Sequence, residues 1–134
     1  MRASAANATS WPRKAIWRSR PTCSGGSSPG IRDIEATVHH IRREEGVPKV
    51  GCVGYCLGGR LAYMTAARTD VDASVGYYGV GIDGLLDEKH AIAHPLMLHI
   101  PTEDGFVDKD TQKAMHAGLD DHPKVTLHDY EGLD

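Results

Sequence analysis

The sequence lacks several features that would assign it to whole classes of protein. No apolar run in its 134 residues approaches the ~20 residues that a membrane-spanning helix needs. The cysteines are few and odd in number, Cys23, Cys52 and Cys56, and no secretory signal precedes them. A disulfide framework is therefore disfavoured, and a reducing, cytoplasmic compartment is expected. The formal net charge of only −3 predicts neither a nucleic-acid partner nor a membrane partner.

Acidic residues are absent from the first 32 positions. The 15 Lys and Arg residues divide into six in this segment and nine after it, while all 18 acidic residues come after it, so the two parts carry about +6 and −9. The segment is also rich in Ser, Ala and Gly and shows no apolar periodicity. We interpret residues 1–30 as a disordered or unrelated leader, with a transit peptide as the alternative, and residues 31–134 as the folded part.

Short apolar runs alternate with helical patterns from Ile31 onward. The alternation predicts an α/β fold, with a parallel sheet and flanking helices. Functional residues in such sheets gather where the strands end, which places Cys56 and Asp104 at one edge of the sheet. The predicted strands are 49–55, 72–79, 95–100 and 124–130, the predicted helices are 31–45, 57–68 and 108–121, and residues 81–94 are expected to form mainly a loop.

The stretch "GYCLGG", which begins at Gly54, places a cysteine where the first of these strands turns into a helix. G-x-nucleophile-x-G at such a turn is the pattern of a nucleophile elbow, because side chains two residues before or after the nucleophile would collide. Gly54 and Gly58 fit that need, and Gly59 would let the helix pack close to the sheet. Cys56 would lie at the helix N-terminus, which favours a thiolate, and the N–H of Leu57 would face a developing oxyanion.

A second interpretation of the same residues is a structural cysteine beside glycines that allow a helix to pack. The bare G-x-C-x-G spacing leaves both interpretations open. A metal site is disfavoured, because Cys52 lies inside the predicted strand, no C-x-x-C is present and no second ligand pair follows. We expect neither a metal nor a cofactor.

Four stretches, "GYCLGGRLAY", "VDASVGYYGVG", "HPLMLHIPTEDGFV" and "HPKVTLHDYEG", resemble the dienelactone hydrolases, also called carboxymethylenebutenolidases, in order and spacing. The resemblance covers about residues 30–134. It implies an α/β-hydrolase fold and a Cys–His–Asp triad that opens a small-molecule lactone or activated ester without a cofactor. By this resemblance Cys56 matches the nucleophile, Asp104 matches the triad acid, and Tyr77 and Tyr78 match a strand end beside the substrate pocket.

The sequence departs from the family pattern in two respects. The family carries its triad histidine in a G-x-H-x-F segment after the last strand, whereas this sequence reads "HDYEGLD" there. A counterpart of roughly the first half of the hydrolase domain is also missing. The resemblance thus implies an incomplete domain, its C-terminal half, with impaired hydrolysis and an exposed sheet edge that would allow self-association. The alternatives are a catalytically silent fragment or interaction module, and a flavodoxin-like binding domain.

Other polar residues have simpler structural interpretations. His99 and His128 fall inside predicted strands, so we expect them to pack rather than to catalyse. Arg60, one turn into the helix after Cys56, is either an exposed charge or an anion contact. Asp108 precedes a predicted helix and fits the N-cap position.

Overall fold

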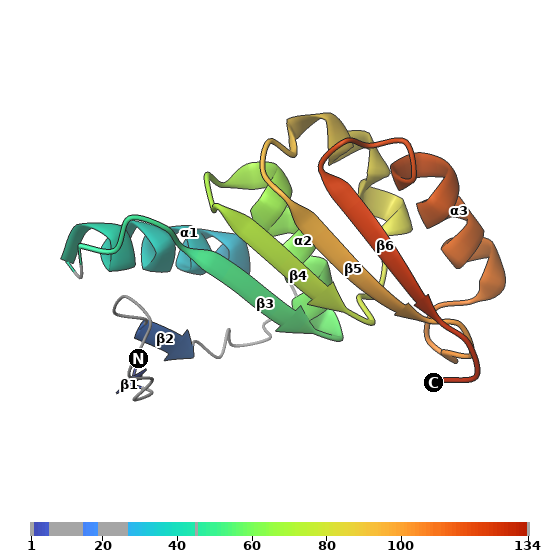
Figure 1. Ribbon diagram of the computed structural model, residues 1–134, viewed down its shortest axis with the longest axis horizontal. Coiled ribbons are helices and arrows are strands. Elements are labelled where there is room, and N and C mark those ends of the chain that lie inside the picture. Colours follow the sequence, from blue (N-terminus) through green and yellow to red (C-terminus); the bar gives the residue numbers. More distant parts are fainter. Residues whose placement is uncertain (1, 6–14, 19–26, 45, 134) are drawn as a thin grey trace. The chain divides into compact units, whose positions relative to one another are not determined.

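A computed structural model describes residues 2–5, 15–18, 27–44 and 46–133. The chain divides into two compact units, Met1–Pro48 and Lys49–Asp134. In the first unit, β1 (Arg2–Ala5) and β2 (Ala15–Arg18) pair antiparallel, and α1 spans Ser27–Glu44 (Figure 1). Most of the predicted leader, residues 1–30, lies outside the described residues.

Helix α1 begins four residues before the predicted start at Ile31. The apolar period that predicts the helix begins only at Ile31, and Pro29 discourages an earlier start. A proline in the first turn costs no hydrogen bond, however, because the N–H groups there have no acceptor within the helix. Among the described residues, no helix is both long and apolar enough to cross a membrane.

The second unit is a four-stranded parallel sheet, with strand order β3-β4-β5-β6, and its helices cover one face (Figure 1). The α/β prediction, a parallel sheet with flanking helices, is confirmed, and the 3₁₀ helix η1 replaces most of the expected loop. The strands are β3 (Gly51–Tyr55), β4 (Ala73–Tyr77), β5 (Leu96–Pro101) and β6 (Val125–Tyr130), and the helices are α2 (Leu57–Arg68), η1 (Asp83–Ala91) and α3 (Lys109–Leu119).

The core of this unit lies between the sheet and the helices α2, η1 and α3. Alternate residues of β5 point into it, and Leu96 and Leu98 are each only 1% exposed. Met115 and Leu119, four residues apart on one face of α3, meet the same cluster. Each fully buried side chain of this size contributes roughly 1.5–3 kcal/mol, so this face holds the unit together.

A row of stacked rings crosses the opposite face of the sheet. Tyr55 and Tyr77 stack with ring centroids 5.0 Å apart, Tyr77 and His99 at 4.3 Å, and His99 and His128 at 5.4 Å. We call these four residues the aromatic row. The Tyr130 hydroxyl lies 2.7 Å from Nδ1 of His99. Partial burial, and then the charge of His128, lower the pKa of His99. Both histidines therefore pack within strands, as predicted.

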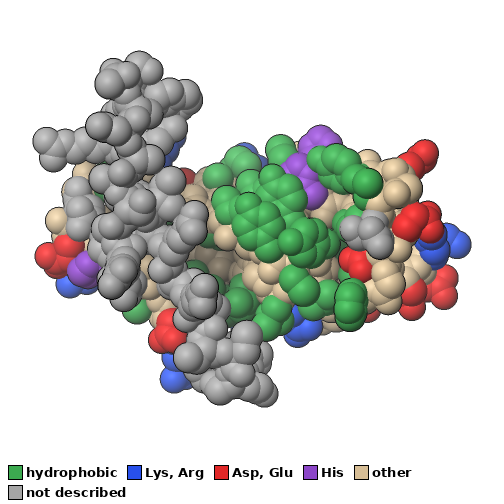
Figure 2. Space-filling model, turned by 90° about the horizontal axis from the view of Figure 1, so that it is seen from below, with side chains coloured by type: hydrophobic (Ala, Val, Ile, Leu, Met, Phe, Trp, Pro, Cys, Tyr) green, Lys and Arg blue, Asp and Glu red, His purple; other side chains and the backbone are tan. Residues whose placement is uncertain are grey.

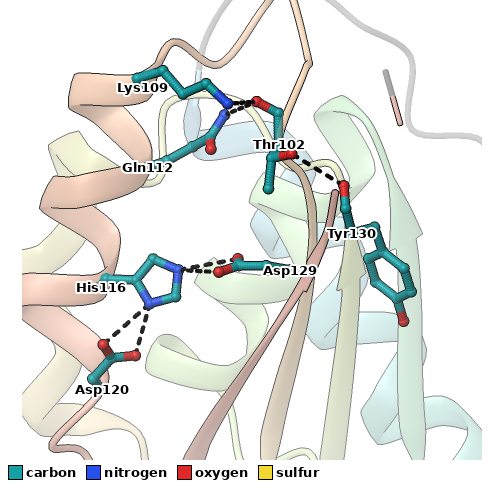
Figure 3. Close-up of polar contacts among 7 residues, drawn as sticks. All are labelled: Thr102, Lys109, Gln112, His116, Asp120, Asp129 and Tyr130. Atoms are coloured by element: carbon teal, nitrogen blue, oxygen red, sulfur yellow. Dashed lines mark hydrogen bonds and ion pairs between the residues drawn. The ribbon is translucent and has the colours of Figure 1, made fainter. Parts of the chain in front are cut away.

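His116 joins α3 to the end of β6 (Figure 3). Its Nδ1 lies 2.9 Å from Oδ1 of Asp120, and its Nε2 lies 3.0 Å from Oδ1 of Asp129. Partial burial by itself lowers the pKa of His116, but the hydrogen bonds and charges of the two carboxylates outweigh it, so the pKa is raised above its ordinary value. The protonated imidazole is thus the form that the fold prefers.

We expect His116 to make the stability of the second unit depend on pH. Its folded pKa lies above the unfolded value of about 6.5, so its contribution is complete below that pH and is lost as the pH rises through the folded pKa. Urea unfolding of the wild type and of His116→Gln measures this at about pH 5.5 and about pH 8.5. The variant should be less stable at the lower pH, and the gap should narrow at the higher one. A gap of constant size would contradict the assignment.

Candidate active site

Cys56 occupies the sharp turn between β3 and α2. Its backbone has φ 58° and ψ −117°, a conformation that residues other than glycine rarely adopt. Its N–H donates to the carbonyl of Tyr77 at 3.0 Å, and its carbonyl accepts from the N–H of Gly59 at 2.9 Å. The side chain is exposed. The strand–turn–helix context predicted around this cysteine is present.

Two glycines let this turn form and let α2 lie close to the sheet. A Cβ on Gly54 would lie 1.8 Å from the carbonyl oxygen of Gly58, and a Cβ on Gly59 would lie 2.8 Å from the carbonyl oxygen of Tyr77. Gly58 differs from the expectation, because a Cβ there would meet no atom within 4 Å. The collision is between position 54 and the backbone of Gly58. The turn therefore requires glycine at position 54, whereas position 58 has room for a side chain.

Leu57 is the first residue of α2. The first N–H groups of a helix have no acceptor within it, and the helix dipole adds partial positive charge at the same end. Leu57 directly follows Cys56 in the sequence, and the thiol of Cys56 is exposed. An oxygen that gains negative charge next to that sulfur would find donors here.

Asp104 lies in the loop between β5 and α3, and its Oδ1 accepts a hydrogen bond from the Phe106 N–H at 2.8 Å. It lines a small cavity together with Tyr78 and His99. Tyr78 follows β4 with a positive φ of 39°. The rest of the cavity is lined by Gly76, Gly79, Ile82, Leu98, Ile100, Pro101, Val107 and Met115.

The structure thus brings two predicted site residues, Asp104 and Tyr78, to one cavity. Tyr77 instead belongs to the aromatic row, between Tyr55 and His99. Cys56 lies beside Tyr77 at the end of the neighbouring strand. Figure 2 shows hydrophobic side chains gathered beside histidine on the side toward which the strands run.

His99 is a cavity residue with a titratable side chain that sequence reasoning did not place at the site. Its position inside a predicted strand favoured a packing role, and it does pack. The missing signal was the register, which pairs Tyr77 with His99 across parallel strands. Residues that pair near the ends of parallel strands lie at the same edge of the sheet, so this register also puts His99 near the loop of Asp104.

Arg60 is partly buried rather than a fully exposed charge, and its predicted contact with an anion stays a prediction. Its Nη1 donates to the carbonyl of Gly81 at 3.3 Å. Gly81 has a positive φ of 68°, and a Cβ there would lie 2.3 Å from the same nitrogen. Arg60 therefore braces the loop that follows β4.

Cys52 lies inside β3, as predicted, and is partly buried. Its thiol donates to the Ser74 hydroxyl at 3.1 Å. Burial raises the pKa of Cys52, and hydrogen bonds with Ser74 and Thr65 offset this only in part. In the described part of the chain, no group of three or more His, Cys, Asp or Glu side chains is arranged to hold a metal ion.

The strained backbone of Cys56 leads to a prediction about stability. Residues held in such sparsely populated regions cost about 1–3 kcal/mol, and glycine would relieve that cost at an entropic penalty of roughly 0.5–1 kcal/mol. Cys56→Gly should therefore raise the free energy of unfolding by about 1 kcal/mol in a urea titration. Cys56→Ser, which keeps the Cβ, should leave it near the wild-type value. A Gly variant less stable than the Ser variant would contradict the strain.

The arrangement, a parallel sheet with a strand–turn–helix junction at its edge, is that of α/β-hydrolase-fold proteins. A solved esterase of Pyrococcus furiosus superposes with a TM-score of 0.63 and 18% identity over 77% of this chain and 52% of its own. A model of the dienelactone hydrolase family matches residues 12–134. This chain belongs to the dienelactone hydrolase family.

Individual relatives agree with this assignment. The carboxymethylenebutenolidase of Pseudomonas putida is 39% identical over 103 residues, which are 76% of this chain and 44% of the relative. Carboxymethylenebutenolidase 1 of Cupriavidus pinatubonensis is 34% identical over 105 residues, 75% of this chain and 44% of the relative. The chain thus spans less than half the length of these relatives.

Proposed function

We propose that this chain carries the nucleophile, the acid and one oxyanion donor of a dienelactone hydrolase-type site that acts on a lactone or an activated ester. The observation that carries the proposal is the backbone of Cys56, which holds an exposed thiol in a strained conformation directly before α2. Strain of this kind persists only where the surrounding structure imposes it, and it clusters at functional sites. Family membership supplies the substrate class.

In the proposed reaction, the thiolate of Cys56 attacks the carbonyl carbon and forms a C–S bond. The carbonyl π electrons move to the oxygen, which accepts a hydrogen bond from the Leu57 N–H. Collapse of this intermediate breaks the ester C–O bond, and the leaving oxygen takes a proton. In a lactone that oxygen stays attached to the acyl chain. Water then hydrolyses the thioester and restores the thiol, without a cofactor.

Proton transfer to a general base is the step that this chain supports least. His99 is engaged by Tyr130, and His116 is engaged by two carboxylates. The family's G-x-H-x-F segment has no counterpart in these 134 residues. A positioned base contributes about 10²–10⁴-fold, so we propose that the chain by itself acylates slowly and turns over poorly. Asp104 would orient such a base, with Tyr77 and Tyr78 beside the substrate.

Incubation with p-nitrophenyl acetate tests this function. We expect at most one acetyl group per chain, located on Cys56 by peptide mass mapping, followed by slow release. Cys56→Ser should show no thioester, whereas Cys52→Ser is the matched control, because Cys52 is less exposed than Cys56 and should not be the acylated thiol, so this variant should still acylate. A folded chain that never acylates would refute the nucleophile, and fast turnover would refute the impairment.

A second candidate function is self-association. Within the described sheet, β3 pairs only with β4, and its residues Val53 and Tyr55 are exposed. We propose a second copy of this chain as the partner of this edge, because unpaired strand edges pair readily with other chains.

A further inference from the structure

We propose that Gln112 is a positioning residue, which holds the carboxylate of Asp104 at its place beside the cavity. The proposal rests on the proposed function, in which Asp104 is the site's acid. Gln112 lies in α3 and is only 8% exposed. Its side chain donates hydrogen bonds to carbonyls of the loop that contains Asp104, so any effect on the site acts through that loop.

A single amide group closes the loop of Asp104 from both sides. Nε2 of Gln112 donates to the carbonyl of Val107 at 2.9 Å and to the carbonyl of Thr102 at 3.2 Å. These two carbonyls stand on either side of Asp104 in the sequence. The two N–H groups of one amide can serve both acceptors, so Gln112 fixes the span of the loop.

The Thr102 end of this loop has further support (Figure 3). Thr102 donates its N–H to the Tyr130 carbonyl at 3.0 Å, which joins the loop to β6. Lys109 also donates to the Thr102 carbonyl, but its side chain is 59% exposed. The carbonyl of Val107, in contrast, accepts from Gln112 in a buried contact. Among the described residues, the tie to Val107 is therefore the one that no other side chain duplicates.

The closed loop determines where the Asp104 carboxylate can lie. Its Oδ1 accepts from the N–H of Phe106, two residues along the same loop. The Phe106 side chain is 88% exposed, so packing does not hold this segment down. If the loop from Thr102 to Val107 becomes more mobile, the hydrogen bond from the Phe106 N–H to Oδ1 of Asp104 should weaken as well. The Phe106 amide is therefore a direct reporter of the carboxylate's position.

Amide hydrogen exchange and NMR titration of the full chain test this role. Gln112→Met keeps the length of the side chain but cannot donate, so we expect the Phe106 amide to exchange about tenfold faster, the factor for one lost hydrogen bond. Its chemical shift should also stop reporting the titration of Asp104. Lys113→Met, an exposed position of the same helix, is the matched control and should change neither reading.

Gln112→Glu supplies a signature that a merely structural role would not give. An ionised carboxylate faces two carbonyls without a proton to donate, so at neutral pH this variant should behave like Gln112→Met. Burial disfavours the ionised form, and protonation restores one O–H donor. Phe106 protection should therefore recover on acidification only in the Glu variant.

Two results would overturn the positioning role. One is a folded Gln112→Met chain whose Phe106 exchange and titration match the wild type. The other applies if the Met variant does not fold. It is a Glu variant in which the Phe106 amide is equally protected at neutral pH and after acidification. Neither reading involves Cys56, so failure of acylation, which would refute the proposed function, is distinguishable from failure of this role.

Discussion

Replacing Gly54 with alanine is expected to destroy the cooperative fold of the second unit. The new Cβ would lie 1.8 Å from the carbonyl oxygen and 2.3 Å from the carbonyl carbon of Gly58. Both are backbone atoms of the first turn of α2, which cannot move away without unwinding that turn or shifting β3. We expect a loss of more than about 4 kcal/mol, a size reached by few substitutions, from a total of about 5–15 kcal/mol.

Gly58→Ala is the matched control for this experiment. It adds the same methyl group four residues away in the same motif, but into open space. Replacing a glycine inside a helix with alanine stabilises it by roughly 0.5–1 kcal/mol. Urea unfolding followed by circular dichroism should therefore show opposite signs for the two variants. Equal stability of Gly54→Ala and the wild type would mean that the turn has a different geometry.

The sequence predicted the sheet well, because each of its strands is short, apolar and bounded by turn residues. It predicted one glycine of the motif for the wrong reason. G-x-C-x-G is symmetrical in sequence, but the chain is a strand before Cys56 and a helix after it. A Cβ on Gly58 would meet open space, whereas the carbonyl of Gly58 lies where a Cβ on Gly54 would have to be. A rule based on residue spacing alone cannot distinguish the glycine in the strand from the glycine in the helix.

The candidate site was predictable only in part. Strand ends located Cys56 and Asp104, since the ends of parallel strands share an edge, whereas Tyr78 came from the family resemblance. The proposed role of Gln112 depends on the path of the loop from Thr102 to Val107. No residue spacing in the sequence predicts that loop conformation. The N-cap role of Asp108 was easier to predict, because an N-cap is a local sequence pattern. Its side chain does accept a hydrogen bond from the Thr111 N–H at 2.8 Å.

The isolated chain is expected to self-associate in a concentration-dependent manner through β3. In the described sheet the outer edge of this strand has no partner strand. Its residues Val53 and Tyr55 are 59% and 58% exposed. Parallel sheets normally have both faces covered, and each large apolar side chain left in water forfeits about 1.5–3 kcal/mol. Pairing with a second copy would satisfy the edge and cover these side chains.

Size-exclusion chromatography with light scattering over a range of concentrations measures this association. Val53→Lys should shift the chain toward monomer, because a charge on an edge strand opposes pairing. Met97→Lys is the matched control. Met97 is 37% exposed, but it lies in the interior strand β5. If only Val53→Lys dissociates the assembly, the edge is the contact. If both substitutions dissociate it, the contact is the face of the sheet that the helices do not cover.

The two outcomes differ in what they imply for the site. A contact along the edge of β3 would place a second chain beside the turn that holds Cys56, since that turn directly follows β3. A contact through the face would instead cover the aromatic row, with Tyr77 and His99. Acylation of Cys56 should therefore slow with rising protein concentration in the first case only. A wild-type chain that stays monomeric and unfolds in one sharp urea transition would contradict both, because the exposed edge would then carry no measurable cost.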